Sequence, residues 1–279
     1  MPNPIADPFV EVPDTDSTSK LVTIEGTVEG AVTVTLNRAA KKNAFNAELI
    51  GALRDAFETL RDQEAVRVVF VRGDGGTFSA GADLEWMRDA VDQLEEDNRV
   101  DAMQMALMLK HLFDIPALTV ALVEGGAFGG GVGLAAACDM AIATQDAKFS
   151  FSEVRLGLIA ATISPYVVAA IGSRRARRLF STGEVFDAEH ARDFGLVDEV
   201  VADAQALAVA KARIAKAQLA AAPGAVAESK KLVAEVAGKD IDHGLMRHTA
   251  HRIAAQRVGD EGQAGVRAFL DGKKAPWAV

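Results

Sequence analysis

Residues 117–134 read ALTVALVEGGAFGGGVGL, and this stretch decides the fold. Its first seven residues, 117–123, form a continuous apolar run, which is typical of a strand covered on both faces of a sheet. A glycine cluster follows at 125–133 and leads into a small-residue segment with helical character. A strand that passes through a glycine turn into a helix is the repeating unit of an α/β fold, so this stretch predicts that class.

The same unit recurs on both sides of this stretch. Residues 66–71 (VRVVFV) predict another buried strand, and residues 77–83 (TFSAGAD) supply a glycine-bearing turn after it. Residues 139–143 (DMAIA) lead to a third strand, while residues 21–36 (LVTIEGTVEGAVTVTL) predict a hairpin around a glycine turn. Strands that alternate with helices indicate right-handed crossovers between parallel strands.

The chain divides by composition into three parts. Residues 1–19 are rich in proline and weakly periodic, and they predict a mobile N-terminal arm. Residues 20–201 carry the alternating strands and helices and predict an α/β core domain. Residues 202–279 turn to Ala, Lys, Glu and Gln with helical periodicity and predict a helical C-terminal module. Its many small apolar residues suit close helix packing or contact between subunits.

Charge and hydropathy exclude several classes of function. The chain has 30 Lys and Arg against 39 Asp and Glu, a formal net charge of -9, which argues against a general nucleic-acid surface. It contains no uninterrupted apolar stretch of the ~20 residues needed to span a bilayer. Residues 1–20 also lack the apolar centre of a secretory signal. We therefore expect a cytoplasmic protein with neither a nucleic-acid nor a membrane partner.

The thiol and imidazole side chains offer little chemistry. The single cysteine, Cys138, lies in an apolar run and is expected to be inert, because a reactive thiolate needs an electropositive setting. No H-E-x-x-H motif occurs among the five histidines, so we expect no metal site. Asp139 is expected to cap or enter a strand rather than to act as a catalyst.

The two glycine turns, 77–83 and 125–133, suggest a pair of main-chain donors. A turn between a strand and a helix exposes amides that can stabilise a negative oxygen. Two amides from separate turns form the arrangement of an oxyanion hole, although each turn alone could serve only to reverse the chain. Neither the dinucleotide fingerprint nor a phosphate-binding loop fits, because the acidic partner and the Gly-Lys-Ser/Thr sequence are missing.

Several blocks resemble a known family. The segment 78–84 (FSAGADL) resembles the F-x-A-G-A-D block of the crotonase (enoyl-CoA hydratase/isomerase) superfamily, and 129–139 (GGGVGLAAACD) resembles its G-G-G-x-E-L…C-D block. The segment 149–158 (FSFSEVRLGL) resembles F-x-x-P-E-x-x-x-G, and 194–200 (FGLVDEV) resembles G-L-V-x-x-V. The blocks occur in the family's order, and the resemblance runs from about Leu21 to Lys274.

The resemblance implies a spiral of ββα units with a C-terminal helical module, assembled as a homotrimer or a homohexamer. It implies an acyl-CoA thioester as substrate, with coenzyme A entering as part of that substrate and no separate cofactor. By position, the amides of Ala82 and Gly130 would hold the thioester oxygen as it becomes an enolate. Glu153 would be the acid and base.

One position departs from the hydratase pattern. Hydratases of this family carry two glutamates, and the first of those positions is Gly133 here, which predicts an open slot opposite Glu153. A single carboxylate would have to move both protons of a hydration, which is divided between two groups when both are present. The sequence therefore predicts a 2-enoyl-CoA hydratase, with a double-bond isomerase or a catalytically silent acyl-CoA-binding protein as alternatives.

Substrate contacts follow from the same resemblance. The segment 153–168 (EVRLGLIAATISPYVV) is similar to the methylglutaconyl-CoA hydratase branch, which is used in leucine degradation and acyclic-terpene breakdown. The wider family resemblance implies a role in fatty acid metabolism. Arg155 would then bind a second substrate carboxylate, or else form a structural ion pair. The remaining residues expected to contact the substrate are Ala80, Asp83, Leu84, Gly129 and Gly133, together with Phe269 and Lys273 from a neighbouring subunit's tail. The family's tail lysine is replaced by Gly272 here, so Lys273 either takes its place or is a solvated terminal lysine.

Overall fold

The N-terminal hairpin forms as its sequence predicts. In this computed structural model, which describes residues 21–278, β1 (Val22–Gly26) pairs antiparallel with β2 (Ala31–Leu36), and Ile24 lies opposite Val34. The predicted arm at residues 1–19 lies outside the described residues.

The main sheet has six strands in the order β1-β2-β3-β4-β6-β9. The strands after β2 are β3 (Val68–Gly73), β4 (Leu118–Val123), β6 (Met140–Thr144) and β9 (Glu199–Val201), and from β2 onward neighbouring strands are parallel. The three apolar runs that predicted buried strands are therefore β3, β4 and β6. The prediction of an α/β fold with a parallel sheet is confirmed.

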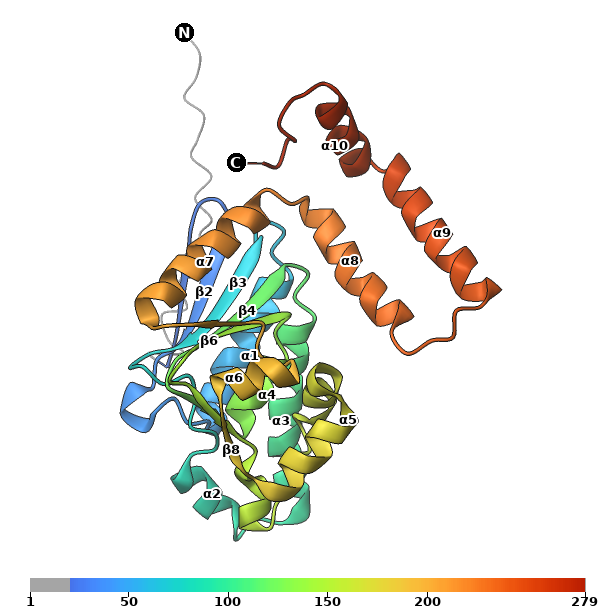
Figure 1. Cartoon of the computed structure of the whole chain (residues 1–279). Helices are drawn as coiled ribbons and strands as arrows, with labels where there is room; N and C mark the ends of the chain where they lie inside the picture. The colour runs from blue at the N-terminus through green and yellow to red at the C-terminus, as the bar shows by residue number, and fades with distance from the viewer. Residues whose placement is uncertain (1–20, 279) are drawn as a thin grey trace.

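Both faces of this sheet are buried, because successive side chains of a strand point to opposite faces. Val69 and Val71 of β3 join the core that includes α1 (Ala47–Arg61) and α3 (Glu95–Phe113), whereas Val68 and Phe70 join a second core beneath α7 (Ala204–Leu219). Figure 1 shows α7 lying along the sheet on the side away from α1 and α3. Asn46 caps α1 as predicted, since its side chain accepts a hydrogen bond from the amide of Leu49.

A second, three-stranded sheet lies next to the main sheet, and the sequence did not predict it. Its strands are β5 (Gly126–Phe128), β7 (Lys148–Ser150) and β8 (Val185–Asp187). Phe149 of β7 stacks on Phe186 of β8 with ring centroids 5.7 Å apart. This sheet supports the helical elements that follow its strands, which are α4 (Gly130–Ala136), η2 (Ser152–Leu156), α5 (Ser164–Thr182) and α6 (Ala188–Phe194).

Three helices stand apart from this body as an arm (Figure 1). They are α8 (Pro223–Val236), α9 (His243–Val258) and α10 (Asp260–Leu270), and none of them contains a buried residue. The predicted helical module began at residue 202, but α7 packs on the sheet through Leu207, Ala210 and Ile214. The boundary between the α/β body and the helical arm therefore lies after α7. None of the helices between residues 21 and 278 has the length and hydropathy needed to cross a bilayer.

Candidate active site

The two glycine turns predicted to act together lie in contact. Ser79 of the first turn pairs with Ala127 of the second in a parallel β-bridge. The amide of Ser79 donates to the carbonyl of Gly126 over 3.1 Å, and the amide of Phe128 donates to the carbonyl of Ser79 over 3.0 Å. Main-chain hydrogen bonds of this kind hold the two turns in a fixed register.

Glycine is required where these turns meet. Gly81 has φ +87°, and a Cβ atom at this position would lie 2.9 Å from the carbonyl oxygen of Phe128. A positive φ is accessible to glycine at little cost, and the close approach leaves no room for a side chain. This close approach brings Ala82, which follows Gly81, beside Gly129 and Gly130, which follow Phe128.

The amides of Ala82 and Gly130 are free donors at this junction. Phe45 forms hydrogen bonds with the residues on either side of Ala82, accepting from Asp83 over 2.8 Å and donating to Gly81 over 2.7 Å. Gly130 is the first residue of α4, where an amide has no acceptor within its own helix. Within the described range 21–278, neither amide donates a hydrogen bond. Two unpaired N–H groups on touching turns can both donate hydrogen bonds to one oxygen placed between them.

A small residue is also needed at Gly130 itself. A Cβ atom there would lie 2.8 Å from Cε of Met105 and 3.2 Å from the ring of Phe45. Met105 comes from α3 and Phe45 from the segment before α1, and both are buried. Their apolar atoms form one side of the space around the Gly130 amide, and this contribution was not predicted from the sequence.

Glu153 lies beside the second turn. It belongs to η2, which follows β7, and its Oε1 atom lies 3.0 Å from the position that a Cβ atom on Gly129 would occupy. Its other carboxylate oxygen, Oε2, is buried and has no hydrogen-bond partner among the described residues. Burial raises the pKa of this carboxyl above its ordinary value of 4.5. A half-buried acid with one unoccupied oxygen is typical of a group that exchanges protons with a ligand.

The slot expected at Gly133 is closed. A Cβ atom on Gly133 would lie 2.0 Å from Cγ2 of Ile163 and 2.5 Å from its Cβ atom. The isoleucine side chain therefore fills the volume in which a side chain at residue 133 would begin. The sequence offered no sign of this contact, because Ile163 and Gly133 are adjacent only in the folded chain.

Asp83 is committed to the protein itself. Its carboxylate lies 2.5 Å from Nη1 of Arg38, and it caps α2 (Leu84–Ala90) by accepting from the amides of Glu85 and Trp86. These contacts hold the pKa of Asp83 below its ordinary value, and the Arg38 hydrogen bond is the main cause. The Asp83 side chain therefore fixes the turn that carries Ala82, and the predicted substrate contact of this residue stays a prediction.

Asn43 is a site-supporting residue that the sequence analysis missed. It is fully buried with φ 53°, and its side chain donates to the carbonyls of Asp74 and Thr77 and accepts from the amide of Arg38. Asparagine tolerates this left-handed conformation better than most residues, and its amide group can bind several main-chain groups at once. An asparagine before the predicted helix cap was the available signal.

The other predicted contacts are distributed around and away from the two turns. Ala80 lies within the first turn, and its amide donates to the carbonyl of Lys42, whereas Leu84 directly follows the turn and is exposed. Arg155 is exposed on η2, and Nε lies 3.2 Å from the position of a Cβ atom on Gly183. No acidic side chain among residues 21–278 forms an ion pair with it, so the structural ion pair considered as an alternative is not formed there.

The tail residues are not brought to this site within one copy of the chain. Phe269 is exposed on α10, and Lys273, beyond α10, pairs with Asp271 over 3.1 Å. Figure 1 places α10 at the opposite end of the molecule from α2, which follows the first turn. A role for either residue therefore requires a neighbouring copy, as the family resemblance implied.

Cys138 and Asp139, which were expected to take no part in catalysis, lie away from solvent or bind other residues of the chain. Burial raises the pKa of the Cys138 thiol, which keeps it protonated and unreactive. Asp139 accepts hydrogen bonds from the amide and hydroxyl of Thr119 and pairs with Lys230. The described part of the chain, 21–278, contains no group of three or more His, Cys, Asp or Glu side chains that could hold a metal ion.

Comparison with known proteins agrees with this geometry. The model of the enoyl-CoA hydratase/isomerase family matches residues 26–279. Enoyl-CoA hydratase AKT6-1 from Alternaria alternata is 32% identical over 251 residues, covering 88% of this chain and 80% of that protein.

Solved structures are similar over almost the whole chain. An enoyl-CoA hydratase from Shewanella pealeana superimposes with a TM-score of 0.89 at 36% identity, covering 94% of this chain and 97% of that one. Pseudomonas aeruginosa AtuE superimposes with a TM-score of 0.88 at 36% identity, covering 93% of this chain and all of that one. On this agreement of sequence, fold and site geometry, the chain belongs to the enoyl-CoA hydratase/isomerase family.

Proposed function

We propose that this protein is a hydratase that adds water across the double bond of a 2-enoyl-CoA. One observation carries the proposal: the carboxylate of Glu153 lies beside Gly129, directly before the free amide of Gly130, and keeps one buried oxygen without a protein partner in the described range. A thioester whose oxygen accepts from Ala82 and Gly130 would extend its acyl group past this acid.

The proposed reaction uses one acid and two amides. Glu153 takes a proton from water as the water oxygen bonds to the β-carbon of the substrate. The electron pair of the double bond moves to the thioester, whose oxygen becomes an enolate held by the amides of Ala82 and Gly130. Glu153, now protonated, returns its proton to the α-carbon, and the hydrated thioester forms. Every proton taken from water is thereby retained in the product.

The surroundings of Glu153 suit both halves of this exchange. A proton-transfer group works best when its pKa lies near the operating pH, because it must both accept and release the proton. Burial raises the pKa of Glu153 above the ordinary value of a glutamate carboxyl. The same carboxyl is therefore a stronger base than a solvated glutamate and still releases its proton to carbon.

A double-bond isomerase is the second candidate, and the contact between Gly133 and Ile163 favours it. An isomerase needs only one acid and base, which removes a proton from one carbon of the acyl chain and returns it to another. Water has no part in that reaction, so an apolar group where hydratases carry a second glutamate would not hinder it.

Absorbance of the conjugated enoyl thioester distinguishes the two activities. Hydration of crotonyl-CoA or 3-methylglutaconyl-CoA lowers this absorbance, whereas isomerisation of a 3-enoyl-CoA to the 2-enoyl form raises it. We expect a fall with at least one of the first two substrates. A rise with the 3-enoyl-CoA and no change with the others would replace the hydratase by the isomerase.

Glu153→Gln tests the catalytic assignment. The amide can neither take nor return a proton, so we expect kcat on the best substrate to fall by ~10²–10⁴-fold. Glu58→Gln is the matched control, because Glu58 is exposed on α1 and should leave kcat unchanged. Turnover that survives Glu153→Gln would indicate a different catalytic group, and no turnover by the unaltered protein on any of the three substrates would favour a silent acyl-CoA-binding protein.

We further propose a branched acyl group with a second carboxylate as substrate. The unpaired guanidinium of Arg155, two residues from Glu153 on η2, is the group that would bind it, since guanidinium and carboxylate form paired hydrogen bonds. Arg155→Met should raise KM for 3-methylglutaconyl-CoA by at least tenfold and leave KM for crotonyl-CoA unchanged. An equal change for both substrates would indicate that Arg155 only supports the fold.

The coenzyme A portion is proposed to contact two copies of the chain in a homotrimer or homohexamer. The segment 80–84 of one copy would hold the adenine, with Phe269 and Lys273 of the next copy completing the site. Phe269→Ala should raise KM for every acyl-CoA and leave kcat unchanged. A mixture of Phe269→Ala and Glu153→Gln chains that recovers part of the low-KM activity would indicate sharing between copies.

A further inference from the structure

Residue 133 cannot carry a side chain while Ile163 stays in place. Cβ atoms in proteins essentially never lie within 3.0 Å of a heavy atom from a residue that is not adjacent in the chain, yet a Cβ atom on Gly133 would lie 2.0 Å and 2.5 Å from two Ile163 atoms. These are Cγ2 and the branching Cβ atom, so the conflict involves the base of the isoleucine side chain rather than its flexible end. Rotation about χ1 moves Cγ2 but leaves Cβ where it is.

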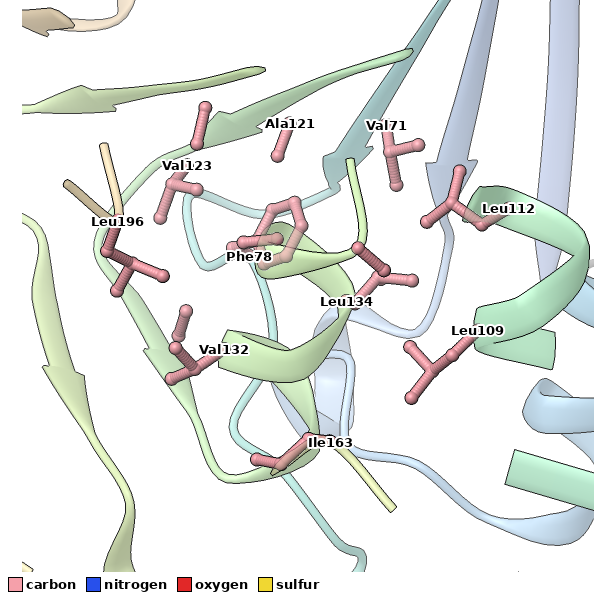
Figure 2. Close-up of a cluster of buried hydrophobic side chains, with 14 of the residues drawn as sticks. Val71, Phe78, Leu109, Leu112, Ala121, Val123, Val132, Leu134, Ile163 and Leu196 are labelled. Carbon is pink, nitrogen blue, oxygen red and sulfur yellow. The ribbon is translucent and has the colours of Figure 1, made fainter. Parts of the chain in front are cut away.

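The isoleucine is held from both sides of the contact. Ile163 is 2% exposed and directly precedes α5, where its carbonyl accepts a hydrogen bond from the amide of Val167 over 3.1 Å. On the other side, Gly133 donates to the carbonyl of Gly129 and accepts from the amide of Ala137. Figure 2 shows Ile163 beside the helix that carries Val132 and Leu134, which is α4. Neither backbone can withdraw without breaking these hydrogen bonds.

The same side of α4 also meets the catalytic acid. Gly129 and Gly133 are joined by a hydrogen bond of 3.2 Å and lie one helical turn apart. A Cβ atom on Gly129 would lie 3.0 Å from Oε1 of Glu153. A Cβ atom on Gly133 would overlap the side chain of Ile163. The start of α4 therefore has a carboxylate against one turn and a branched alkyl group against the next.

We infer that Ile163, rather than the absence of a side chain at Gly133, restricts this site to single-carboxylate chemistry. The inference rests on the proposed function, because it concerns which groups can move protons around the enoyl thioester. With Ile163 in place, a second acid cannot be installed by changing residue 133. Ile163 is thus a positioning residue that sets the number of acids in the site.

A stability cycle tests the packing without reference to activity. Alanine is a better helix former than glycine, so Gly133→Ala should raise Tm if space allows. We expect it to lower Tm in the unaltered chain and in Ile163→Ala, which keeps the conflicting Cβ atom. In Ile163→Gly it should raise Tm, because the nearest remaining Ile163 backbone atom, Cα, is 3.6 Å away.

Gly51→Ala is the control for this cycle. Gly51 lies within α1, and a Cβ atom there would meet nothing within 4 Å, so this change should raise Tm in every background. Gly133→Ala that raises Tm in the unaltered chain, as Gly51→Ala does, would overturn the packing part of the inference. A fall in Tm with Gly133→Ala in Ile163→Gly would overturn it as well.

An activity comparison tests the chemical part. Gly133→Glu/Ile163→Gly should hydrate crotonyl-CoA at least tenfold faster than Gly133→Gln/Ile163→Gly, and its rate-pH profile should gain one further ionisation. Equal rates in the two folded double variants would overturn the claim that Ile163 limits the number of acids. If the unaltered protein hydrates none of the substrates while the stability cycle behaves as expected, the proposed function fails and the packing part of the inference stands.

Discussion

The body and the arm are built from similar helices but bury very different amounts of them. In the body, residues 21–219, α1 presents a stripe of fully buried apolar side chains to the sheet. In the arm, residues 223–270, no residue of α8, α9 or α10 is buried, and Phe269 is 83% exposed. Helices in proteins are stabilised mainly by packing of an apolar face. The body can supply that packing from its own residues. The arm is instead held by ion pairs within it and by contacts of Lys230 on α8 with the body.

The difference also separates the two kinds of functional residue. The free amides and Glu153 depend on contacts within the body, such as the bridge between Ser79 and Ala127. Phe269 and Lys273 depend on an arm whose apolar surface is uncovered in a single chain. We therefore expect the residues proposed for catalysis to tolerate dissociation of the proposed assembly better than Phe269 and Lys273, which are proposed to bind coenzyme A.

Replacing one paired arginine in each region should give the largest change in the free energy of unfolding, and the two changes should differ most. In Arg38→Met, Asp83 keeps its charge in a site where its side chain is 4% exposed, so we expect ~3–5 kcal/mol lower free energy of unfolding. Arg252→Met removes pairs with Glu228 and Glu235 in the arm, where the three side chains are 26%, 27% and 35% exposed, and we expect a loss of ~1 kcal/mol or less.

The two tryptophans allow these effects to be read separately. Trp86 lies on α2 in the body, and Trp277 packs against Gly265 of α10 in the arm. Urea unfolding followed by fluorescence in Trp277→Phe and Trp86→Phe backgrounds would therefore report on one region at a time. Equal losses from the two arginine changes would contradict the proposed difference between body and arm.

A matched pair of leucine truncations gives the next largest effect. Leu109 on α3 is 0% exposed, and Leu109→Ala should lower the free energy of unfolding by ~2–5 kcal/mol through a cavity and lost burial. Leu270 at the end of α10 is 75% exposed, and Leu270→Ala should change it by no more than ~0.5 kcal/mol. Measured on the dissociated chain, a cost above 1 kcal/mol for Leu270→Ala would show that the arm has its own core.

Sequence periodicity was sufficient for the long elements of the body. The run 66–71 predicted β3 because both faces of that strand are covered, so apolar residues occupy successive positions. The strands β5, β7 and β8 have three residues each, too few for a period to be recognised. The small sheet that supports η2 and α4 was missed for this reason.

Two features of the site and the arm depend on contacts that composition does not encode. The segment 204–219 is richer in alanine than the arm, which is why composition placed it in the helical module, yet it packs on the sheet as α7. Ile163 fills the space at Gly133 through a contact made only in the folded chain. The family blocks located Glu153 and the two amide positions, but they could not reveal what closes the neighbouring slot.

Lys230 on α8 connects the arm to the body, and replacing it should lower the free energy of unfolding by an intermediate amount. Nζ of Lys230 on α8 donates to the carbonyls of Ile115 and Ala117 over 2.6 Å and 2.9 Å and pairs with Asp139 over 2.7 Å. Lys230→Met leaves these acceptors with fewer partners, and we expect a loss of ~1–3 kcal/mol. The neighbouring Lys231→Met removes an exposed pair and should cost ~1 kcal/mol or less. Hydrogen exchange should increase first in α8 for Lys230→Met, and no difference between the two variants would exclude Lys230 as this connection.

The smallest effect expected is a change with pH. The pKa of Asp83 is held below its ordinary value of 3.8 in the folded chain, chiefly by Arg38, so the carboxylate stabilises the fold at neutral pH. This contribution is complete above the unfolded pKa and is lost as pH falls through the folded pKa. The difference in stability between the unaltered chain and Asp83→Asn should therefore be constant from pH 7 to 5 and shrink below pH 4. Unfolding measured with Trp86 as the reporter would test this, and a difference that grows on acidification would mean that Asp83 is destabilised by its burial rather than stabilised by Arg38.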